Sequence, residues 1–420
     1  MMQKADYDEL ALSPYRALDL TDEKGLECGK ILAFMGMDVI KVEPPGGSPA
    51  RCIGPFYHDS LDPEESLFWF VSNVNKRGIT LDITKEDGKA LFLSLVKKSD
   101  IIIESFPVGY LEEIGLTYEE LSRINPRIIV VSISGFGQTG PYSSFKAPDI
   151  VCMATGGEMN LVGTPGRPPL RIGIPQAYLH AGAEAAGACL AALWRCEETG
   201  KGQCIDISAQ ECVARLGFYT QTVFEFSGQN ITRQGSWREL GRDLKFRFLY
   251  PTRDGYISFI PLGGVTRAES MNKLVAWMER EGFADEFLRG LDWALFTPSE
   301  LTPELAERIE PQFQRFFLSH SKEELFSAAL ADGHFIAPVY TAADILKSPH
   351  FKARDFWIQV EHPELGESLV YPGAPFSCNE QNYTIYRRAP LIGEHNHEVF
   401  CEEMGLATDE LVMLKAGGII

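Results

Sequence analysis

The sequence predicts an α/β protein in which a large domain with a parallel sheet is followed by a smaller α+β domain. Strand-like and helix-like segments alternate through about the first 210 residues, the order typical of a parallel sheet covered by helices on both faces. After Val223 the segments become shorter and are separated by Gly and Pro. The length of 420 residues also favours two domains, because single hydrophobic cores stop growing at roughly 250–300 residues.

The elements of the large domain are predicted from apolar runs and from helix-ending signals. Runs such as DIIIES and RIIVVSIS indicate strands that are buried on both faces. A long helix built mostly from Ala and Gly ends before Gly200, a residue typical of a helix C-terminus. The expected strands are 15–20, 38–43, 100–105, 127–134 and 203–208, and the expected helices are 25–36, 86–99, 117–124 and 177–198.

The second half of the sequence indicates a smaller domain, after which the chain returns to the large domain. Strand-like runs between 226 and 264 precede helices at 268–282 and 303–332, and two final helical segments lie at 398–405 and 409–420. Residues 349–377 look irregular, and such a long connection is unusual unless it wraps around something. We therefore expect a large domain at 1–215, a linker at 216–225, a small domain at 226–335, a return linker at 336–384, and a C-terminal part at 385–420 that packs on the large domain.

Composition excludes several classes of function. The net charge of -19 argues against nucleic acid or an anionic membrane as a partner, because phosphates attract clustered Lys and Arg. No run approaches the roughly 20 apolar residues of a membrane span, and the N-terminus lacks the apolar stretch of a secretion signal. We expect a cytoplasmic protein.

Neither the cysteines nor the histidines predict a metal site. Nine cysteines are scattered without a C-x-x-C pair, which fits neither a disulfide framework nor structural zinc. His395 and His397 are two residues apart, a spacing that favours a solvated loop over a pair of metal ligands.

Common nucleotide-binding and hydrolase motifs do not predict a site either. GFGQTG at 135–140 matches G-x-G-x-x-G after a strand, but the next residues do not open a helix, so a pyrophosphate would lack its usual partner. The sequence contains neither a G-x-x-x-x-G-K-[ST] phosphate loop nor a G-x-S-x-G nucleophile turn.

Six segments in order resemble the class III CoA-transferases across nearly the whole chain. They are GMDVIKVEPPGG, NVNKRGITLDIT, SGFGQTGPYSSFKAPDI, TGGEMNLVGTPGRPPLRIG, AALWRCEETGKGQCIDIS and RRAPLIGEHNHEV. The resemblance implies a Rossmann-like large domain and a small domain joined by long linkers, so that each chain is an open ring and two rings interlock. Such a dimer would account for the long irregular segment.

The resemblance also implies the chemistry. These enzymes move CoA between carboxylic acids through an aspartate, which attacks an acyl-CoA thioester to give a mixed anhydride and then an aspartyl-CoA thioester. Only a carboxylate serves in this cycle, because the nucleophile must itself become an acyl donor and be regenerated.

Tyr178 stands at the position that the resemblance assigns to this aspartate. The position is five residues after Gly173 and four before Gly182. A phenol has an ordinary pKa near 10, against about 3.9 for Asp, so it is neutral at pH 7. An aryl ester formed by an ionised phenol would not continue the cycle. We therefore expect no catalytic nucleophile at this site.

Residues near Tyr178 are poor substitutes for the missing nucleophile. Glu184 is six residues further along the helix, about 9 Å away by helix geometry. Asp149 fits the place of an acid that supports catalysis in relatives, but it cannot replace the nucleophile without moving the thioester. His180 is a lone helix histidine. The related racemases use a histidine as base at the position of Pro148. The racemase reaction would therefore also lack its base here.

The CoA-binding segments depart from the family pattern as well. Pro44 and Pro45 follow Glu43 where relatives often carry an arginine, and Ser105 replaces an asparagine. Glu113 replaces a cation, which should cost a few kcal/mol of phosphate binding. We expect this chain to bind CoA weakly or not at all. The residues that remain as candidate CoA contacts are Phe106, Lys146, Gly263 and Gly264.

These features predict a nucleophile-lacking subunit of a heteromeric CoA-transferase, with a homologous partner that bears the aspartate. The resemblance implies an acyl-CoA donor such as succinyl-CoA, a carboxylic acid acceptor such as benzylsuccinate from anaerobic aromatic degradation, CoA bound mainly by the partner, and no metal. Two alternatives stay open: a freestanding acyl-CoA enzyme that uses Tyr178, Asp149 or a water, and an inactive binding homodimer. Aromatic residues that are candidates for a substrate cleft or, more simply, for the core are Phe224, Phe226, Trp237 and Phe248.

Overall fold

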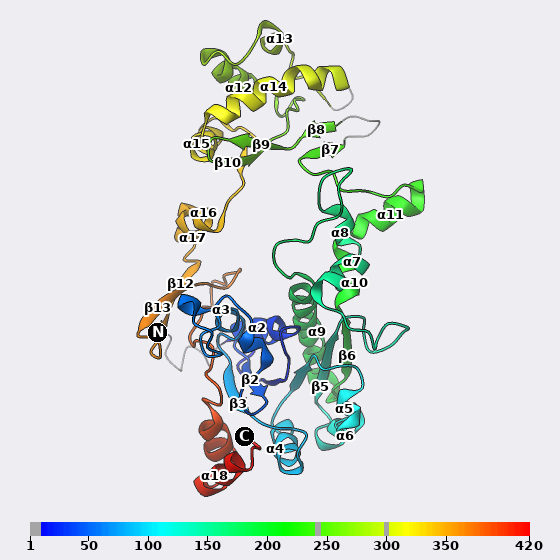
Figure 1. Cartoon of the computed structure of the whole chain (residues 1–420), viewed down its shortest axis with the longest axis vertical. Coiled ribbons are helices and arrows are strands. Elements are labelled where there is room, and N and C mark those ends of the chain that lie inside the picture. The colour runs from blue at the N-terminus through cyan, green and yellow to red at the C-terminus, as the bar shows by residue number, and fades with distance from the viewer. Residues whose placement is uncertain (1–9, 240–244, 298–301) are drawn as a thin grey trace. The chain divides into compact units, whose positions relative to one another are not determined.

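The computed structural model describes residues 10–239, 245–297 and 302–420, which divide into two compact units (Figure 1). Unit 1 contains the residues up to Met159 together with Arg171–Ser227 and Pro349–Ile420. Unit 2 contains Asn160–Leu170 and Gly228–Ser348. Both units are therefore built from segments that are far apart in the sequence.

Unit 1 is organised around a six-stranded parallel sheet, which confirms the predicted α/β class. The strand order is β3-β2-β1-β4-β5-β6, and every neighbouring pair is parallel. The order reverses between β1 and β4, and the crevice outside the carboxyl ends of strands at such a point is the usual ligand site of open α/β sheets. The strands are β1 Arg16–Asp19, β2 Asp38–Glu43, β3 Arg77–Thr80, β4 Ile101–Glu104, β5 Ile129–Ser134 and β6 Cys204–Ser208.

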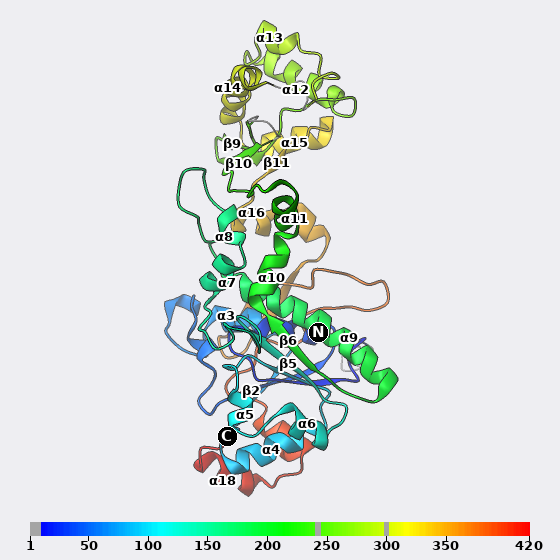
Figure 2. The same cartoon turned by 90° about the vertical axis from the view of Figure 1, so that its right-hand side faces the viewer.

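The sheet is buried on both faces because alternate side chains of its strands enter two different cores. Ile101 and Ile103 pack with α2 and α9, whereas Ile102 packs with α4 and α6. Figure 2 shows α9 on one side of β5 and β6 and α4 and α6 on the other. The helices of this part of unit 1 are α2 Leu26–Phe34, α3 Leu67–Ser72, α4 Glu86–Val96, α5 Tyr110–Glu113, α6 Tyr118–Ile124, α7 Asp149–Thr155, α9 Ala177–Thr199, α10 Ala209–Leu216 and α11 Phe218–Ser227, with α8 Glu158–Leu161 at the boundary to unit 2.

The C-terminal segments of unit 1 are more regular than the sequence pattern indicates. The stretch 349–377 was expected to be irregular, but it carries α17 Pro349–Ala353 and an antiparallel hairpin of β12 Trp357–His362 and β13 Glu367–Pro372. A π-helical segment at His397–Glu403 and α18 Thr408–Ala416 follow. Ile419 and Ile420 are buried in the same core as α4, so the chain end packs on the sheet.

Unit 2 is a small α+β body with an aromatic core. Rings of Tyr250, Phe259, Phe313 and Phe317 lie with centroids 5.1–6.1 Å apart. Its elements are β7 Trp237–Glu239, β8 Lys245–Arg247, β9 Leu249–Thr252, β10 Gly255–Ser258, β11 Ala337–Pro338, α12 Ala268–Arg280, α13 Glu286–Arg289, α14 Pro303–Ser319, α15 Lys322–Asp332 and α16 Ala342–Lys347.

Strand β3 was not predicted, because its sequence RGIT lacks an apolar run. Arg77 is nevertheless buried, since its guanidinium lies 2.7 Å from Asp38 and 2.8 Å from Glu398. The strand thus depends on charged partners from distant segments. Across the part of the chain that the structure covers, we find no helix with the length and apolar character needed to cross a bilayer.

Candidate functional site

Tyr178 lies in the first turn of α9, where it is 9% exposed. Its hydroxyl donates a hydrogen bond to the carbonyl oxygen of Ala147, and the Cys152 sulfur lies 3.9 Å from the Tyr178 hydroxyl oxygen. Burial raises the pKa of Tyr178 far above its usual value, and Cys152, Asp22 and Glu23 add to this effect. The side chain is therefore a neutral phenol that is held in place at the helix N-terminus.

The Asp149 carboxylate accepts hydrogen bonds at the N-terminus of α9. Its Oδ1 accepts hydrogen bonds from the backbone N–H of Gln176 at 2.7 Å and of Ala177 at 2.8 Å. These N–H groups have no partner within the helix, and no side chain of the N-cap residue satisfies them. The other oxygen, Oδ2, is buried and lacks a hydrogen-bond partner among the described atoms. Asp149 thus caps α9, a structural role that the sequence pattern did not indicate.

Ser105 is engaged with the loop that follows β1. Its Oγ accepts a hydrogen bond from the backbone N–H of Asp22 at 2.9 Å and donates one to Asp22 Oδ1 at 2.7 Å. The hydroxyl therefore both accepts and donates a hydrogen bond within the chain. A ligand at this edge of the sheet would have to break this pair to reach Ser105.

A cavity of about 460 Å³ opens at the carboxyl ends of β2, β3 and β4. Phe106 and Tyr110 line it with ring centroids 4.6 Å apart, and Pro44 and Pro45 form part of its wall. The nearby Lys85 ammonium is already bound to the carbonyl oxygens of Gly417 and Gly418, at 3.0 and 2.8 Å. The cavity thus has two aromatic rings in its wall, and the nearby lysine is already engaged by the chain end.

The other predicted CoA contacts are Lys146 in unit 1 and Gly263 and Gly264 in unit 2. Lys146 is exposed on the loop between β5 and α7, and it does not line the cavity. Gly263 and Gly264 belong to unit 2, where their N–H groups donate to the carbonyls of Phe296 and Trp293 at 2.9 and 2.7 Å. A Cβ atom on Gly263 would lie 1.9 Å from Trp293 O, so packing alone explains this glycine.

The alternative nucleophiles are placed elsewhere. Glu184 is exposed on α9, on the other side from the buried Tyr178, and its carboxylate lies 2.6 Å from Arg215. His180 is half-buried on the same helix. Among residues 10–239, 245–297 and 302–420, no cluster of three metal-ligating side chains occurs; His395 Nδ1 instead accepts the Gly78 N–H at 3.1 Å.

The candidate cleft aromatics are split between the two units. Phe224 and Phe226 lie on α11 in unit 1 and are 49% and 86% exposed. Trp237 and Phe248 lie in unit 2, where the Arg247 guanidinium stacks 4.8 Å above the Trp237 ring. Of these four residues, only Phe224 and Phe226 share a unit with Tyr178.

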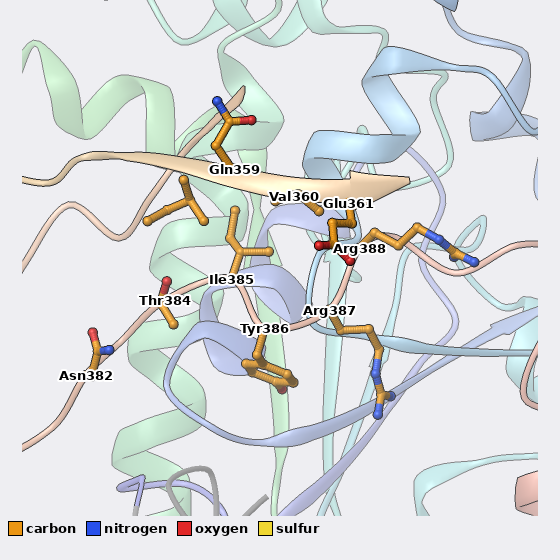
Figure 3. A pocket seen from close by; sticks show the side chains of 10 residues that line it. Gln359, Val360, Glu361, Asn382, Thr384, Ile385, Tyr386, Arg387 and Arg388 are labelled. Atoms are coloured by element: carbon orange, nitrogen blue, oxygen red, sulfur yellow. The ribbon is translucent and has the colours of Figure 1, made fainter. Parts of the chain in front are cut away.

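Another cavity, of about 520 Å³, contains none of the predicted site residues. It lies between β12 and the extended segment 382–388, with Val360, Ile385 and Arg387 among its lining side chains (Figure 3). Phe106 lines the smaller cavity at the carboxyl edge of the sheet, and Tyr178 lies at the N-terminus of α9 in the same unit.

The buried carboxyl of Glu104, at the end of β4, should make the free energy of unfolding depend on pH. Its pKa is raised to about 7, mainly by burial; hydrogen bonds from Ser132 and the Phe106 N–H oppose this rise, and the nearby Glu112 and Asp22 add to it. Because the folded-state pKa lies above the usual 4.5, the stability from this group is fully present below pH 4.5 and is lost as pH rises through 7. We expect a loss of about 3 kcal/mol between pH 5 and pH 8.

Urea unfolding at these two pH values tests this expectation. Glu104→Gln should remove most of the difference, whereas Glu119→Gln, at an exposed position, should leave it in place. If the stability of Glu104→Gln changed with pH as much as that of the unaltered chain, Glu104 would not be the source of the pH dependence.

Sequence and structure comparisons define the class of protein. The sequence model of CoA-transferase family III matches residues 15–396, so the chain belongs to this family. The crystal structure of a CAIB/BAIF family protein from Brucella suis superimposes with a TM-score of 0.79 at 28% identity, covering 94% of this chain and 99% of that one.

Among characterised relatives, the chain is 34% identical to the succinyl-CoA:(R)-benzylsuccinate CoA-transferase subunit BbsE of Thauera aromatica, over 93% of both chains. It is 33% identical to the succinyl-CoA–D-citramalate CoA-transferase of Chloroflexus aurantiacus, over 94% of both chains. It is 30% identical to a formyl-CoA:oxalate CoA-transferase of Streptomyces coelicolor, over 98% of this chain and 99% of that one.

Proposed function

We propose that this chain is the nucleophile-lacking subunit of a heteromeric class III CoA-transferase and works with a homologous partner that bears the aspartate. The observation that carries the proposal is the neutral, buried phenol of Tyr178. The spacing to nearby glycines leads us to equate this residue with the family nucleophile. A phenol with a strongly raised pKa is a poor nucleophile at neutral pH. The chain would then serve as scaffold for the partner's site.

Two polar side chains near the cavity at the carboxyl edge of the sheet support the same division of roles between the subunits. Ser105 is paired with Asp22, and Lys85 is bound to the chain end, so neither is free for a phosphate. CoA would therefore be bound mainly by the partner. Interlocking of the two chains as open rings, with domain linkers near 216–225 and 336–384, is part of the proposal, as is a cytoplasmic location.

The relatives support a substrate class for this proposal. The relative from Thauera aromatica is a subunit of a succinyl-CoA:(R)-benzylsuccinate CoA-transferase. We propose the same kind of reaction for the complex, with an acyl-CoA such as succinyl-CoA as donor and a carboxylic acid such as benzylsuccinate as acceptor. The thioester and the free carboxylate exchange CoA, so the reaction is redox-neutral and needs no metal.

Co-expression with an aspartate-bearing homologue tests the proposal. The purified chain alone should give no CoA transfer from succinyl-CoA above the uncatalysed rate, whereas the complex should be active. Tyr178→Phe in the complex should retain the rate within about twofold, because the hydroxyl takes no part in the chemistry. Transfer by the chain alone, lost in Tyr178→Phe, would instead establish a freestanding enzyme.

A further inference from the structure

One face of the paired strands β7 and β8 carries an aromatic ring and two basic side chains (Figure 1). Successive side chains of a strand point to opposite faces, and Phe246 of β8 is buried in the aromatic core of unit 2. Lys245 and Arg247, on either side of Phe246 in the sequence, therefore lie on the opposite face. Trp237 of β7 is paired with Arg247 in the antiparallel register, so its ring lies on this face as well.

Arg247 holds the Trp237 ring in place. Its guanidinium lies 4.8 Å from the ring centroid, and its Nε donates a hydrogen bond to Glu310 of α14 at 2.8 Å. A cation above an aromatic face is attracted by the ring, and the acid on α14 fixes this cation in turn. The ring is therefore positioned by contacts within unit 2 before any ligand binds.

The Trp237 ring forms part of the wall of a cavity of about 310 Å³. Cavities that hold small ligands begin at roughly 300 Å³, so this one has room for a small organic molecule. All of its lining residues belong to unit 2, whereas the cavity lined by Phe106 belongs to unit 1. Besides Trp237, the lining residues are Thr164, Pro165, Gln234 and Lys245.

The cavity wall is built from two segments that are distant in the sequence and tied together. Gly235 has a φ of +60°, and a Cβ atom there would lie 3.3 Å from the Cα atom of Thr164. Glycine thus lets the segment 160–170 approach the turn before β7. Arg233 donates hydrogen bonds to the carbonyl oxygen of Arg167 at 2.8 Å and to Asn160 Oδ1 at 3.5 Å. These contacts give the cavity two fixed sides.

The lining side chains offer the contacts that an aromatic acid needs. The indole of Trp237 presents a flat surface on which another ring can stack, and such pairs are favoured beyond the area that they bury. The Lys245 ammonium supplies a positive charge for a carboxylate, and the Thr164 hydroxyl and the Gln234 amide can donate or accept hydrogen bonds. A nucleotide would bring several negative charges to a wall whose described residues include one cation. The combination therefore favours a carboxylate over a ring that bears phosphates.

We propose that this cavity binds an aromatic carboxylic acid, with Trp237 stacking on the aryl ring and Lys245 pairing with the carboxylate. The inference rests on the proposed function for the acid as substrate class. It deepens that function, since it makes the aryl group the feature that is recognised and assigns the recognition to this chain. No bond is made or broken in the cavity, and CoA transfer stays at the aspartate of the partner subunit.

Isothermal titration calorimetry of the purified chain tests the inference, with benzylsuccinate as the aromatic probe and succinate as the probe without the ring. Benzylsuccinate should bind about tenfold more tightly than succinate. Trp237→Ala should remove this preference. Trp194→Ala is the matched control, since it makes the same change at a 73% exposed position of α9 in unit 1 and should leave both affinities unchanged.

Two further variants separate recognition from folding. Trp237→Phe retains a ring and should keep most of the preference for benzylsuccinate, even where Trp237→Ala destabilises β7 and β8. Lys245→Gln should weaken the binding of both acids about threefold, whereas Lys347→Gln, at an exposed position of α16 in the same unit, should not.

Three results would overturn the inference: equal affinity for the two acids, an unchanged preference in Trp237→Ala, or displacement of benzylsuccinate by free CoA at a lower concentration than benzylsuccinate itself requires. The last result would assign the ring-binding surface to the adenine of CoA. Since binding to the chain is measured without CoA transfer, this inference and the proposed function can each fail alone.

Discussion

Tyr178→Asp is expected to leave the chain without CoA transfer and to lower its free energy of unfolding by about 3–5 kcal/mol. The buried ring and its hydrogen bond to Ala147 O would be lost. A carboxylate at the same place would face a carbonyl oxygen and the Cys152 thiol, with Asp22 and Glu23 nearby. The surroundings thus suit a neutral ring and oppose a negative charge.

Urea unfolding and a CoA-transfer assay on the isolated variant measure both effects. Tyr178→Phe is the matched control: it keeps the ring, loses the hydroxyl, and should cost about 1 kcal/mol. A Tyr178→Asp chain that folds stably and transfers CoA as fast as the complex would mean that one residue alone separates this chain from an active enzyme.

Asp19→Ala is expected to cost about 3–5 kcal/mol, because it leaves two buried cations without their counter-charge. Asp19 is fully buried, and its carboxylate lies 3.2 Å from the Lys41 ammonium and 2.8 Å from that of Lys76. Burial opposes its ionisation, but the two lysines outweigh burial and lower its pKa to about 2. Both lysines are also buried.

The position of this cluster links stability to the candidate site. Thr21 donates two hydrogen bonds to Asp19, so the carboxylate fixes the start of the loop that continues to Asp22 and Ser105. Asp87→Ala, at an exposed position on α4, is the control and should change the free energy of unfolding by less than about 0.5 kcal/mol. An Asp19→Ala chain as stable as this control would contradict the account.

Much of the parallel sheet is predictable from the sequence because buried parallel strands are continuous apolar runs. The expected strand 38–43 coincides with β2, and the expected helix 177–198 with α9 Ala177–Thr199. Strand β3 escapes this reasoning because its burial depends on Arg77 meeting acids that are distant in the sequence. The hairpin at 357–372 escapes it because the pairing of two strands, not their composition, defines it.

The candidate site is predictable to a smaller extent. The position of Tyr178 follows from spacing to nearby glycines, and the structure places it at the predicted helix start. The capping role of Asp149, the Ser105–Asp22 pair and the binding of Lys85 by the chain end all join segments far apart in the sequence. Local patterns carry no signal for such contacts.

Intact-mass measurement of both chains of the co-expressed complex, after brief incubation with succinyl-CoA and an acid quench, tests the central claim most directly. The account predicts a mass increase that corresponds to covalently bound CoA on the aspartate-bearing partner and none on this chain. A CoA adduct on this chain, at Tyr178 or at any other residue, would contradict it.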